Sequence, residues 1–116
     1  MTIRIKRVYE PPANEDGQRV LVDRIWPRGV SREGAALDLW LKDIAPSTLL
    51  RKWFGHDPSR FTAFRDRYRQ ELEENPQSVA ELATLAKKGD VVLLYSAHDE
   101  KNNQAVVLAE YLNELQ

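Results

Sequence analysis

Short apolar stretches along the chain predict four β-strands. Residues 20–22 and 91–95 are continuous runs of valine, leucine and tyrosine. Such runs are typical of central strands in a parallel sheet, which are covered on both faces. Two further segments, residues 3–5 and 37–42, alternate apolar and polar side chains. This period of two indicates half-buried strands, although the second segment also fits a short helix.

The middle of the chain has the caps and spacing of two α-helices. Ser47 is expected to cap a short helix over residues 48–54. Asp57-Pro58 supplies an N-cap and a first-turn proline for a longer helix. The buried face of that longer helix is predicted to consist of Phe61, Phe64, Tyr68 and Leu72.

Two more helices are predicted on either side of the last strand. Asn75-Pro76 ends the preceding helix and starts the first of them, and Gly89 is its expected C′ residue. Asp99 or Asn102 is expected to cap the second. Its sheet-facing residues are predicted to be Ala105, Leu108, Ala109, Leu112 and Leu115. The pattern therefore predicts an α/β fold, a small and mainly parallel sheet of three to four strands flanked by helices, in one domain over residues 1–116.

Composition narrows the classes of protein. The chain has 116 residues, is 42% hydrophobic and contains no cysteine, which excludes disulfide scaffolds, cysteine-bound zinc and thiol catalysis. No apolar run approaches the ~20 residues of a membrane span, and the N-terminus has no signal-peptide core. We therefore expect a soluble, cytoplasmic protein without a membrane partner.

Charge is distributed unevenly along the chain. Residues 1–69 contain 14 basic and 9 acidic side chains, whereas residues 70–116 contain 3 and 9. The basic excess is modest and interleaved with acids, which argues against a general nucleic-acid surface. It favours one local basic pocket.

Polar residues cluster where the predicted strands end, which is where open α/β sheets bind ligands. Asp23 directly follows an apolar run, so a guanidinium partner is expected, either Arg24 or Arg28. In a functional interpretation the two arginines form a fork for a phosphate or carboxylate, with Asp23 orienting them and Gly29 allowing close backbone approach. A structural ion pair that fixes the loop is equally compatible with these residues.

A second polar cluster precedes the long helix. Arg51 either joins the anion site or covers the helix surface, and His56 is either a general acid or base or a hydrogen-bonded bystander. Two His-Asp pairs are present, His56-Asp57 and His98-Asp99. Their spacing does not match a metal motif, and no metal site is predicted.

Seven sequence blocks resemble a known family. They are Arg7-Val8-Tyr9, Asp23-Arg24-Ile25-Trp26-Pro27-Arg28-Gly29, Trp40-Leu41-Lys42, Ala45-Pro46-Ser47, Leu50-Arg51-Lys52-Trp53-Phe54, His56-Asp57-Pro58 and Leu93-Leu94-Tyr95-Ser96-Ala97. In this order they resemble the YeaO-like branch of the domain of unknown function 488 family over nearly the whole chain. The resemblance implies a small bacterial-type α/β domain and supplies no established reaction.

Other branches of that family differ in two places. In those branches the segment between the first two strands looks longer and contains a helix. This chain has only residues 10–18 there. A helical crossover implies parallel strands, which we favour here, whereas so short a loop also allows an antiparallel hairpin-like return. In the family that this chain resembles, the longer members tend to have a Cys-His-Arg sequence after the last strand. This chain has Lys101-Asn102-Asn103 there. Thiol or metal chemistry is therefore not carried over.

The leading hypothesis is a protein that binds a small phosphate- or carboxylate-bearing ligand at the carboxyl ends of the strands. The ligand-binding candidates are Tyr9, Arg24, Arg28, Arg51, Asn102 and Asn103. Hydrolysis or group transfer, if it occurs, would use the catalytic candidates Asp23, His56 and Asp99. The alternative is a regulatory or interaction module that presents Trp26, Trp40, Trp53 and the arginines to an acidic partner. The residues specify neither a cofactor nor an oligomeric state.

Overall fold

The computed structural model describes residues 2–115 and contains one four-stranded parallel sheet. Its strands are β1 (Ile3–Arg7), β2 (Gln18–Leu21), β3 (Leu39–Trp40) and β4 (Val91–Tyr95). They are arranged in the order β1-β4-β2-β3, and every neighbouring pair is parallel. The predicted α/β class with a parallel sheet is confirmed. The edge strand β3 is shorter than the alternating segment 37–42 predicts.

The first two strands are parallel but are not neighbours. Ile3 and Gln18 both lie opposite Val91, so β1 and β2 start at the same end of the sheet with β4 between them. The alternative of a hairpin-like return is therefore wrong. The connection crosses the sheet without an α-helix, using only a 3-10 turn, Asn14–Asp16.

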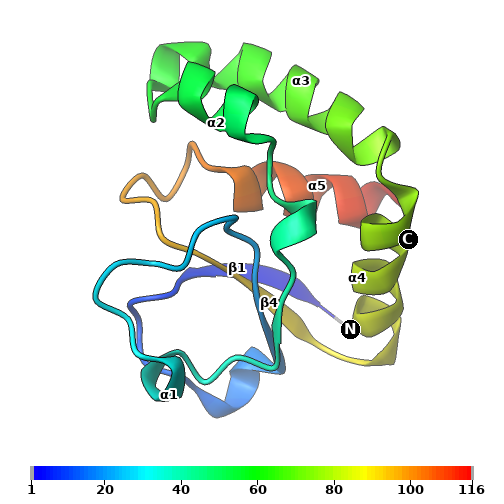
Figure 1. The fold of residues 1–116 in the computed structure, drawn as a ribbon. Helices are drawn as coiled ribbons and strands as arrows, with labels where there is room; N and C mark the ends of the chain where they lie inside the picture. The colour runs from blue at the N-terminus through cyan, green and yellow to red at the C-terminus, as the bar shows by residue number, and fades with distance from the viewer. Residues whose placement is uncertain (1, 116) are drawn as a thin grey trace.

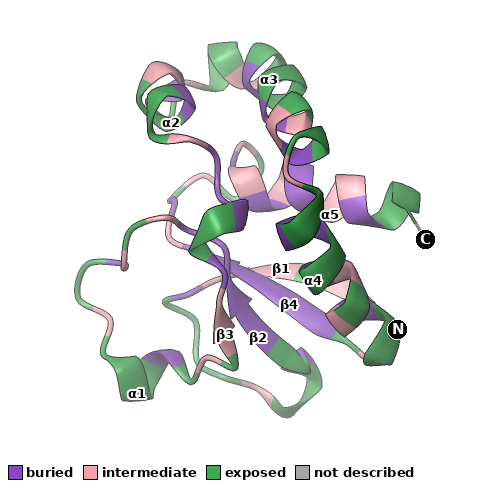
Figure 2. Ribbon diagram, turned by 45° about the vertical axis from the view of Figure 1, so that its right-hand side comes forward, coloured by how far each residue is buried: buried purple, intermediate pink, exposed green. Residues whose placement is uncertain are grey.

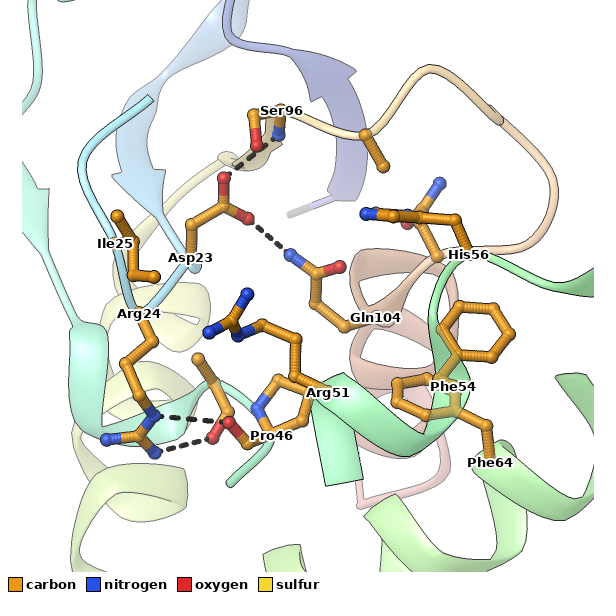
Figure 3. A pocket seen from close by; sticks show the side chains of 13 residues that line it. Asp23, Arg24, Ile25, Pro46, Arg51, Phe54, His56, Phe64, Ser96 and Gln104 are labelled. Carbon is orange, nitrogen blue, oxygen red and sulfur yellow. Dashed lines mark hydrogen bonds between the residues drawn. The ribbon is translucent and has the colours of Figure 1, made fainter. Parts of the chain in front are cut away.

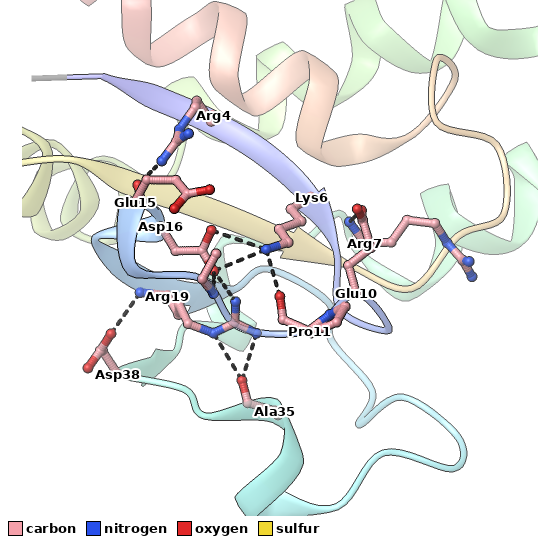
Figure 4. A network of polar contacts seen from close by, with 11 residues as sticks. Arg4, Lys6, Arg7, Glu10, Pro11, Glu15, Asp16, Arg19, Ala35 and Asp38 are labelled. Atoms are coloured by element: carbon pink, nitrogen blue, oxygen red, sulfur yellow. Dashed lines mark hydrogen bonds and ion pairs between the residues drawn. The ribbon is translucent and has the colours of Figure 1, made fainter.

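A network of buried charges holds this short crossover in place (Figure 4). Asp16 accepts hydrogen bonds from Nζ of Lys6 at 3.2 Å and Nη1 of Arg19 at 2.5 Å. Nε and Nη2 of Arg19 donate to the Ala35 carbonyl at 3.1 and 2.9 Å. Because Lys6 lies in β1 and Arg19 in β2, Asp16 ties the connection to both strands that it joins.

Both faces of the sheet are covered, which explains the continuous apolar runs. One face of β2 and β4 packs into a core shared with α2 (Thr48–Phe54), α3 (Phe61–Glu73), α4 (Pro76–Lys88) and α5 (Gln104–Leu115). In Figure 1, α2 and α3 lie on the far side of α5 from the sheet. The opposite face, with Leu21, Val92 and Leu94, packs against Val8 and Ala35, the latter in the short helix α1 (Arg32–Ala35). Figure 2 shows β2 and β4 as the most deeply buried strands.

Most predicted helix boundaries agree with the structure. Ser47 caps α2, with its Oγ accepting a hydrogen bond of 3.2 Å from the Leu50 N–H. Asp57 caps a 3-10 turn, Pro58–Arg60, that leads into α3. Gly89 follows α4 as expected. None of the described helices in residues 2–115 has the length and apolar character to cross a membrane.

The start and end of α5 differ from the prediction. Asn103, rather than Asp99 or Asn102, caps the helix, because its Oδ1 accepts from the Val106 N–H at 3.1 Å. Asp99 instead accepts from the backbone N–H groups of Lys101 and Asn102 and shapes the turn before the helix. Leu115, predicted to face the sheet, is 55% exposed.

Candidate functional site

A small cavity lies beyond the carboxyl ends of β2 and β4 (Figure 3). Its volume is about 120 Å³. It lies between the strand ends, the segment before α2, the adjoining ends of α2 and α3, and the first turn of α5. Its lining residues are Asp23, Arg24, Ile25, Ala45, Pro46, Arg51, Phe54, His56, Phe64, Ser96, Ala97, Asn103 and Gln104. The cavity is therefore where the strand topology leads one to expect a ligand site.

Asp23 is the buried carboxylate of this cavity. It is 9% exposed, and its Oδ2 accepts a 3.0 Å hydrogen bond from the Ser96 N–H. The Gln104 side-chain amide donates to Oδ1. Burial raises the pKa of Asp23 above its ordinary value, and the hydrogen bonds from Ser96 and Gln104 offset part of that rise.

The prediction that Arg24 or Arg28 pairs with the Asp23 carboxylate is wrong. Arg24 turns away and donates from Nε to the Pro46 carbonyl at 3.1 Å and from Nη2 to the Ala45 carbonyl at 3.0 Å (Figure 3). Its side chain fixes the segment that leads into α2. Arg28 is exposed and does not line the cavity, so the predicted Arg24–Arg28 fork does not form.

Gly29 lies outside the cavity. Its φ of +77° is a left-handed conformation that favours glycine, but an added Cβ would have no atom within 4 Å. The left-handed conformation of Gly29 therefore serves a turn, and no described protein atom comes close to it.

Arg51 and His56 reach the cavity from α2 and from the turn that follows it. In Figure 3 the Arg51 guanidinium points into the cavity toward Asp23. Among the residues that the structure describes, the Arg51 side chain has no hydrogen-bond or ion-pair partner. His56 has a left-handed φ of +58°, directly after Gly55 at +55°. This conformation is uncommon for residues other than glycine, with histidine among those enriched in it.

The remaining walls of the cavity are apolar. Phe54 and Phe64 stack with ring centroids 4.4 Å apart. Ile25, Ala45 and Pro46 line the cavity alongside them. The apolar side chains thus lie beside one buried charged group, Asp23, whereas Arg51 and His56 are exposed.

The first turn of α5 contributes Asn103 and Gln104. Asn103 is 1% exposed, and its Nδ2 donates to the Asp99 carbonyl at 2.9 Å. The carboxylate of Asp99 accepts from the Asn102 side-chain amide at 2.9 Å. That bond and the Lys101 and Asn102 backbone N–H groups lower the pKa of Asp99. Asp99 and Asn102 lie in the turn before α5 and do not line the cavity.

Tyr9 and Arg7 form a second layer beside the strand ends. The Tyr9 hydroxyl donates to the Arg28 carbonyl at 3.0 Å, and the Arg7 guanidinium lies 4.8 Å from the Tyr9 ring centroid. Arg7 also donates from Nε to the Ala97 carbonyl at 2.9 Å and from Nη2 to the Ser96 carbonyl at 3.2 Å. Tyr9 is thus outside the cavity, whereas Arg7 holds the backbone that presents the Ser96 N–H to Asp23.

The structure therefore brings part of the predicted set together. Asp23, Arg24, Arg51, His56 and Asn103 line one cavity, and Tyr9, Arg28, Asp99 and Asn102 do not. Sequence reasoning missed Gln104 as a site residue. Its position could have indicated this role, because Gln104 lies beside the predicted start of the last helix and close to the end of the last strand.

Metal-ligating side chains are not grouped in this site. Across residues 2–115, no cluster of three or more histidine, aspartate or glutamate side chains is placed to hold a metal ion. This cavity offers polar groups that suit a small molecule.

Comparison with known proteins gives one family and several relatives. The family model described as "Inactive DUF488-N3 subclade" matches residues 2–116. The uncharacterized protein YeaO of Escherichia coli is 47% identical over 115 residues, covering 99% of this chain and 100% of the relative. The uncharacterized protein Rv3073c of Mycobacterium tuberculosis is 42% identical over 111 residues, covering 96% of this chain and 93% of the relative. No solved structure is significantly similar.

Proposed function

The chain belongs to the DUF488-N3i family, the inactive DUF488-N3 subclade, and from this premise we propose that it binds a small anionic ligand without converting it. The ligand carries a carboxylate or a phosphate and occupies the cavity beyond β2 and β4. The description of the family as inactive and the absence of cysteine from this chain support binding over catalysis.

The position of the Arg51 side chain is the observation that supports this proposal most directly. Its guanidinium points into the cavity, and no group among residues 2–115 pairs with it. A guanidinium matches carboxylate and phosphate oxygens through two parallel hydrogen bonds.

The first turn of α5 supports the same ligand chemistry. Asn103 caps this 12-residue helix, and Asn103 and Gln104 both line the cavity. The first N–H groups of a helix lack intrahelical partners and carry partial positive charge. An anion beside Arg51 would therefore also be stabilised by the start of α5.

The other predicted ligand-binding residues have indirect roles in this proposal. Arg24 positions the Ala45 and Pro46 carbonyls, and Asp99 with Asn102 shapes the turn that places Asn103. Tyr9 and Arg28 brace each other outside the cavity. His56 lines the cavity and, when protonated, adds a second positive charge for the anion.

The alternative of an aromatic interaction surface is less well supported. Arg32 lies 4.2 Å from the Trp26 ring centroid and 5.5 Å from that of Trp40. Arg67 lies 4.2 Å from the ring centroid of Trp53. These arginines thus already contact the tryptophan rings within the chain, which reduces the aromatic surface open to a partner.

Thermal-shift measurements test the proposed binding. The protein would be screened against inorganic phosphate, sugar phosphates, nucleotides and simple carboxylates. A ligand at 100 times its Kd adds about 2.7 kcal/mol to the free energy of unfolding, which is a readily measured rise in Tm.

Two matched variants locate the site. Arg51→Gln should weaken binding by about tenfold or more, since it removes a charged hydrogen-bond donor from the cavity. Arg28→Gln removes the same charge from an exposed position outside the cavity and should retain binding. The proposal fails if no anion stabilises the protein, or if both variants bind as tightly as the unmodified chain.

A further inference from the structure

We propose that the ligand of this cavity is a small zwitterion, in which an ammonium group and a carboxylate or phosphonate share a short, mainly apolar body. This inference rests on the proposed anion site and specifies the class of molecule that occupies it. It is carried by the opposed placement of Asp23 and Arg51.

These two side chains face each other across the cavity without forming an ion pair (Figure 3). Asp23 comes from the end of β2, and Arg51 comes from α2. Asp23 is buried, whereas Arg51 is exposed to solvent. The space between the Asp23 carboxylate and the Arg51 guanidinium suits a molecule that contacts both groups.

Asp23 is fixed where it stands. Its two carboxylate oxygens accept from the Ser96 N–H and from the Gln104 amide, and the Trp40 indole N–H donates to its backbone carbonyl at 2.7 Å. With both oxygens held and 9% of the residue exposed, the carboxylate has little freedom to swing toward Arg51. Asp23 is thus a fixed acceptor on one side of the cavity.

The carboxylate of Asp23 retains hydrogen-bonding capacity on the cavity side. An ionised carboxylate can accept about four hydrogen bonds, and Asp23 accepts them from the Ser96 N–H, the Ser96 side chain and the Gln104 amide. An ammonium group would supply further donors together with the missing positive charge. A ligand with only negative charge would bind Arg51 but would be repelled by Asp23.

Two other ionisable side chains line the cavity, Arg24 and His56, and the charge of His56 lowers the pKa of Asp23. The Arg24 guanidinium is engaged by the Ala45 and Pro46 carbonyls. His56 is exposed at the cavity and faces it from the turn after α2. Asp23 is therefore the acceptor for an ammonium group, and Arg51 with the start of α5 is the site for the anion.

Size and wall chemistry limit the rest of the ligand. A volume of about 120 Å³ is roughly ten times the ~10–15 Å³ that a single water needs on the same measure. Ile25, Pro46, Phe54 and Phe64 offer apolar contacts to a short hydrocarbon chain. A small apolar α-amino acid and a short aminoalkylphosphonate both have this chemistry.

Matched sets of probes test the inference on the unmodified protein. Thermal shift and titration calorimetry would compare L-norvaline with pentanoate, which lacks the ammonium group, and with butylamine, which lacks the carboxylate. A second set compares 2-aminoethylphosphonate with ethylphosphonate, and the standard amino acids extend the first set. In at least one set we expect the zwitterion to bind about tenfold or more tightly than either single-charge analogue, because it gains a charged hydrogen bond.

Asp23→Asn and Arg51→Gln then assign the two charges. Asp23→Asn should reduce the affinity for the zwitterion to that for the matched anion, while leaving the affinity for the anion unchanged or higher. Arg51→Gln should weaken both. If Asp23→Asn does not fold, the comparison within the probe sets still decides the question.

The possible outcomes separate this inference from the proposed function. Anions that match or exceed their zwitterions, with binding lost in Arg51→Gln, would overturn the zwitterion and leave the anion site standing. Binding of butylamine alone, or of none of the zwitterions and anions, would overturn both. A zwitterion advantage that persists in Asp23→Asn would remove Asp23 as the ammonium acceptor and overturn the inference.

Discussion

The Ser96 N–H donates a 3.0 Å hydrogen bond to Oδ2 of Asp23, linking two residues that are 73 positions apart in sequence. They lie just beyond the ends of the neighbouring strands β4 and β2. Because the sheet fixes both strand ends, this bond holds the buried carboxylate in a set orientation toward the cavity. The burial of this carboxylate in turn affects how the stability of the protein depends on pH.

Asp23→Asn should change that pH dependence in a predictable direction. Burial raises the pKa of Asp23, so the folded protein holds this proton more tightly than the unfolded chain, and ionisation lowers stability as the pH rises above about 4. Asparagine does not titrate. The free energy of unfolding of the variant, relative to the unmodified protein, should therefore increase with pH from about 4 upward. Denaturant unfolding at a series of pH values measures this difference. Asp43→Asn, at an exposed position, is the control. A difference that stays constant with pH would contradict the prediction.

Asp16→Asn should destabilise the fold at neutral pH by about 3 kcal/mol, because it leaves the buried Arg19 without its charged partner. Burial alone would raise the pKa of Asp16, but hydrogen bonds from the Ala13 N–H, Lys6 and Arg19 lower it overall. The ionised form therefore stabilises the folded state above about pH 4, and this contribution is lost as the pH falls through the folded-state pKa.

The loss caused by Asp16→Asn should accordingly shrink under acidic conditions. Glu15→Gln, a change of charge at the exposed neighbouring position, should shift the free energy of unfolding by no more than about 0.5 kcal/mol. Urea unfolding at neutral and acidic pH measures both effects. Equal losses in the two variants would contradict a specific role for the Asp16 network.

Gly17→Ala should cost about 2 kcal/mol or more. The φ of Gly17 is +68°, and an added Cβ would lie 2.3 Å from the carbonyl oxygen of Asp90, so both the conformation and the contact require glycine. Gly89→Ala is the matched control, because its Cβ would have no atom within 4 Å and its φ of 171° is extended backbone. Thermal unfolding of the two variants compares the costs, and similar values would contradict the close contact at Gly17.

Mutation of Arg24 to glutamine should affect stability, whereas mutation of Arg51 to glutamine should affect anion affinity. Arg24→Gln removes two hydrogen bonds that hold the segment before α2, so we expect a stability loss of about 1.5–3 kcal/mol. Arg51→Gln removes an exposed guanidinium without a described partner and should change stability by less than about 0.5 kcal/mol. Its effect should fall on anion affinity instead. Calorimetry with denaturant unfolding separates the two roles, and a large stability loss in Arg51→Gln would make that residue structural.

The elements that the sequence predicts well are those determined by neighbouring residues. Ser47 and Asp57 cap where their positions before Leu50 and Pro58 indicate, and the run at 91–95 becomes a strand buried on both faces. Local patterns do not determine the strand order, because the place of β4 between β1 and β2 depends on packing across the whole chain. The helix cap at Asn103 differs from the predicted one because Asp99 satisfies the N–H groups of its own turn first.

The location of the candidate site is easier to predict than its contacts. Parallel strands place their following residues at one edge, which brings Asp23 and Ser96 together. The hydrogen-bond partners depend on the directions of long side chains, which sequence does not reveal. Arg24 could reach either the carboxylate beside it or carbonyl groups 21 and 22 residues away, and it reaches the carbonyls. Ligand binding by this cavity remains a prediction.

The position of β4 also has a consequence for how the protein folds during synthesis. β1 and β2 lie in the first fifth of the sequence, and each pairs with β4, which is the last strand to be made. A nascent chain that ends before residue 91 therefore lacks the strand that joins its first strand to the rest of the sheet. The sheet can therefore close only after residues 91–95 have left the ribosome, so its folding depends on late, long-range pairing.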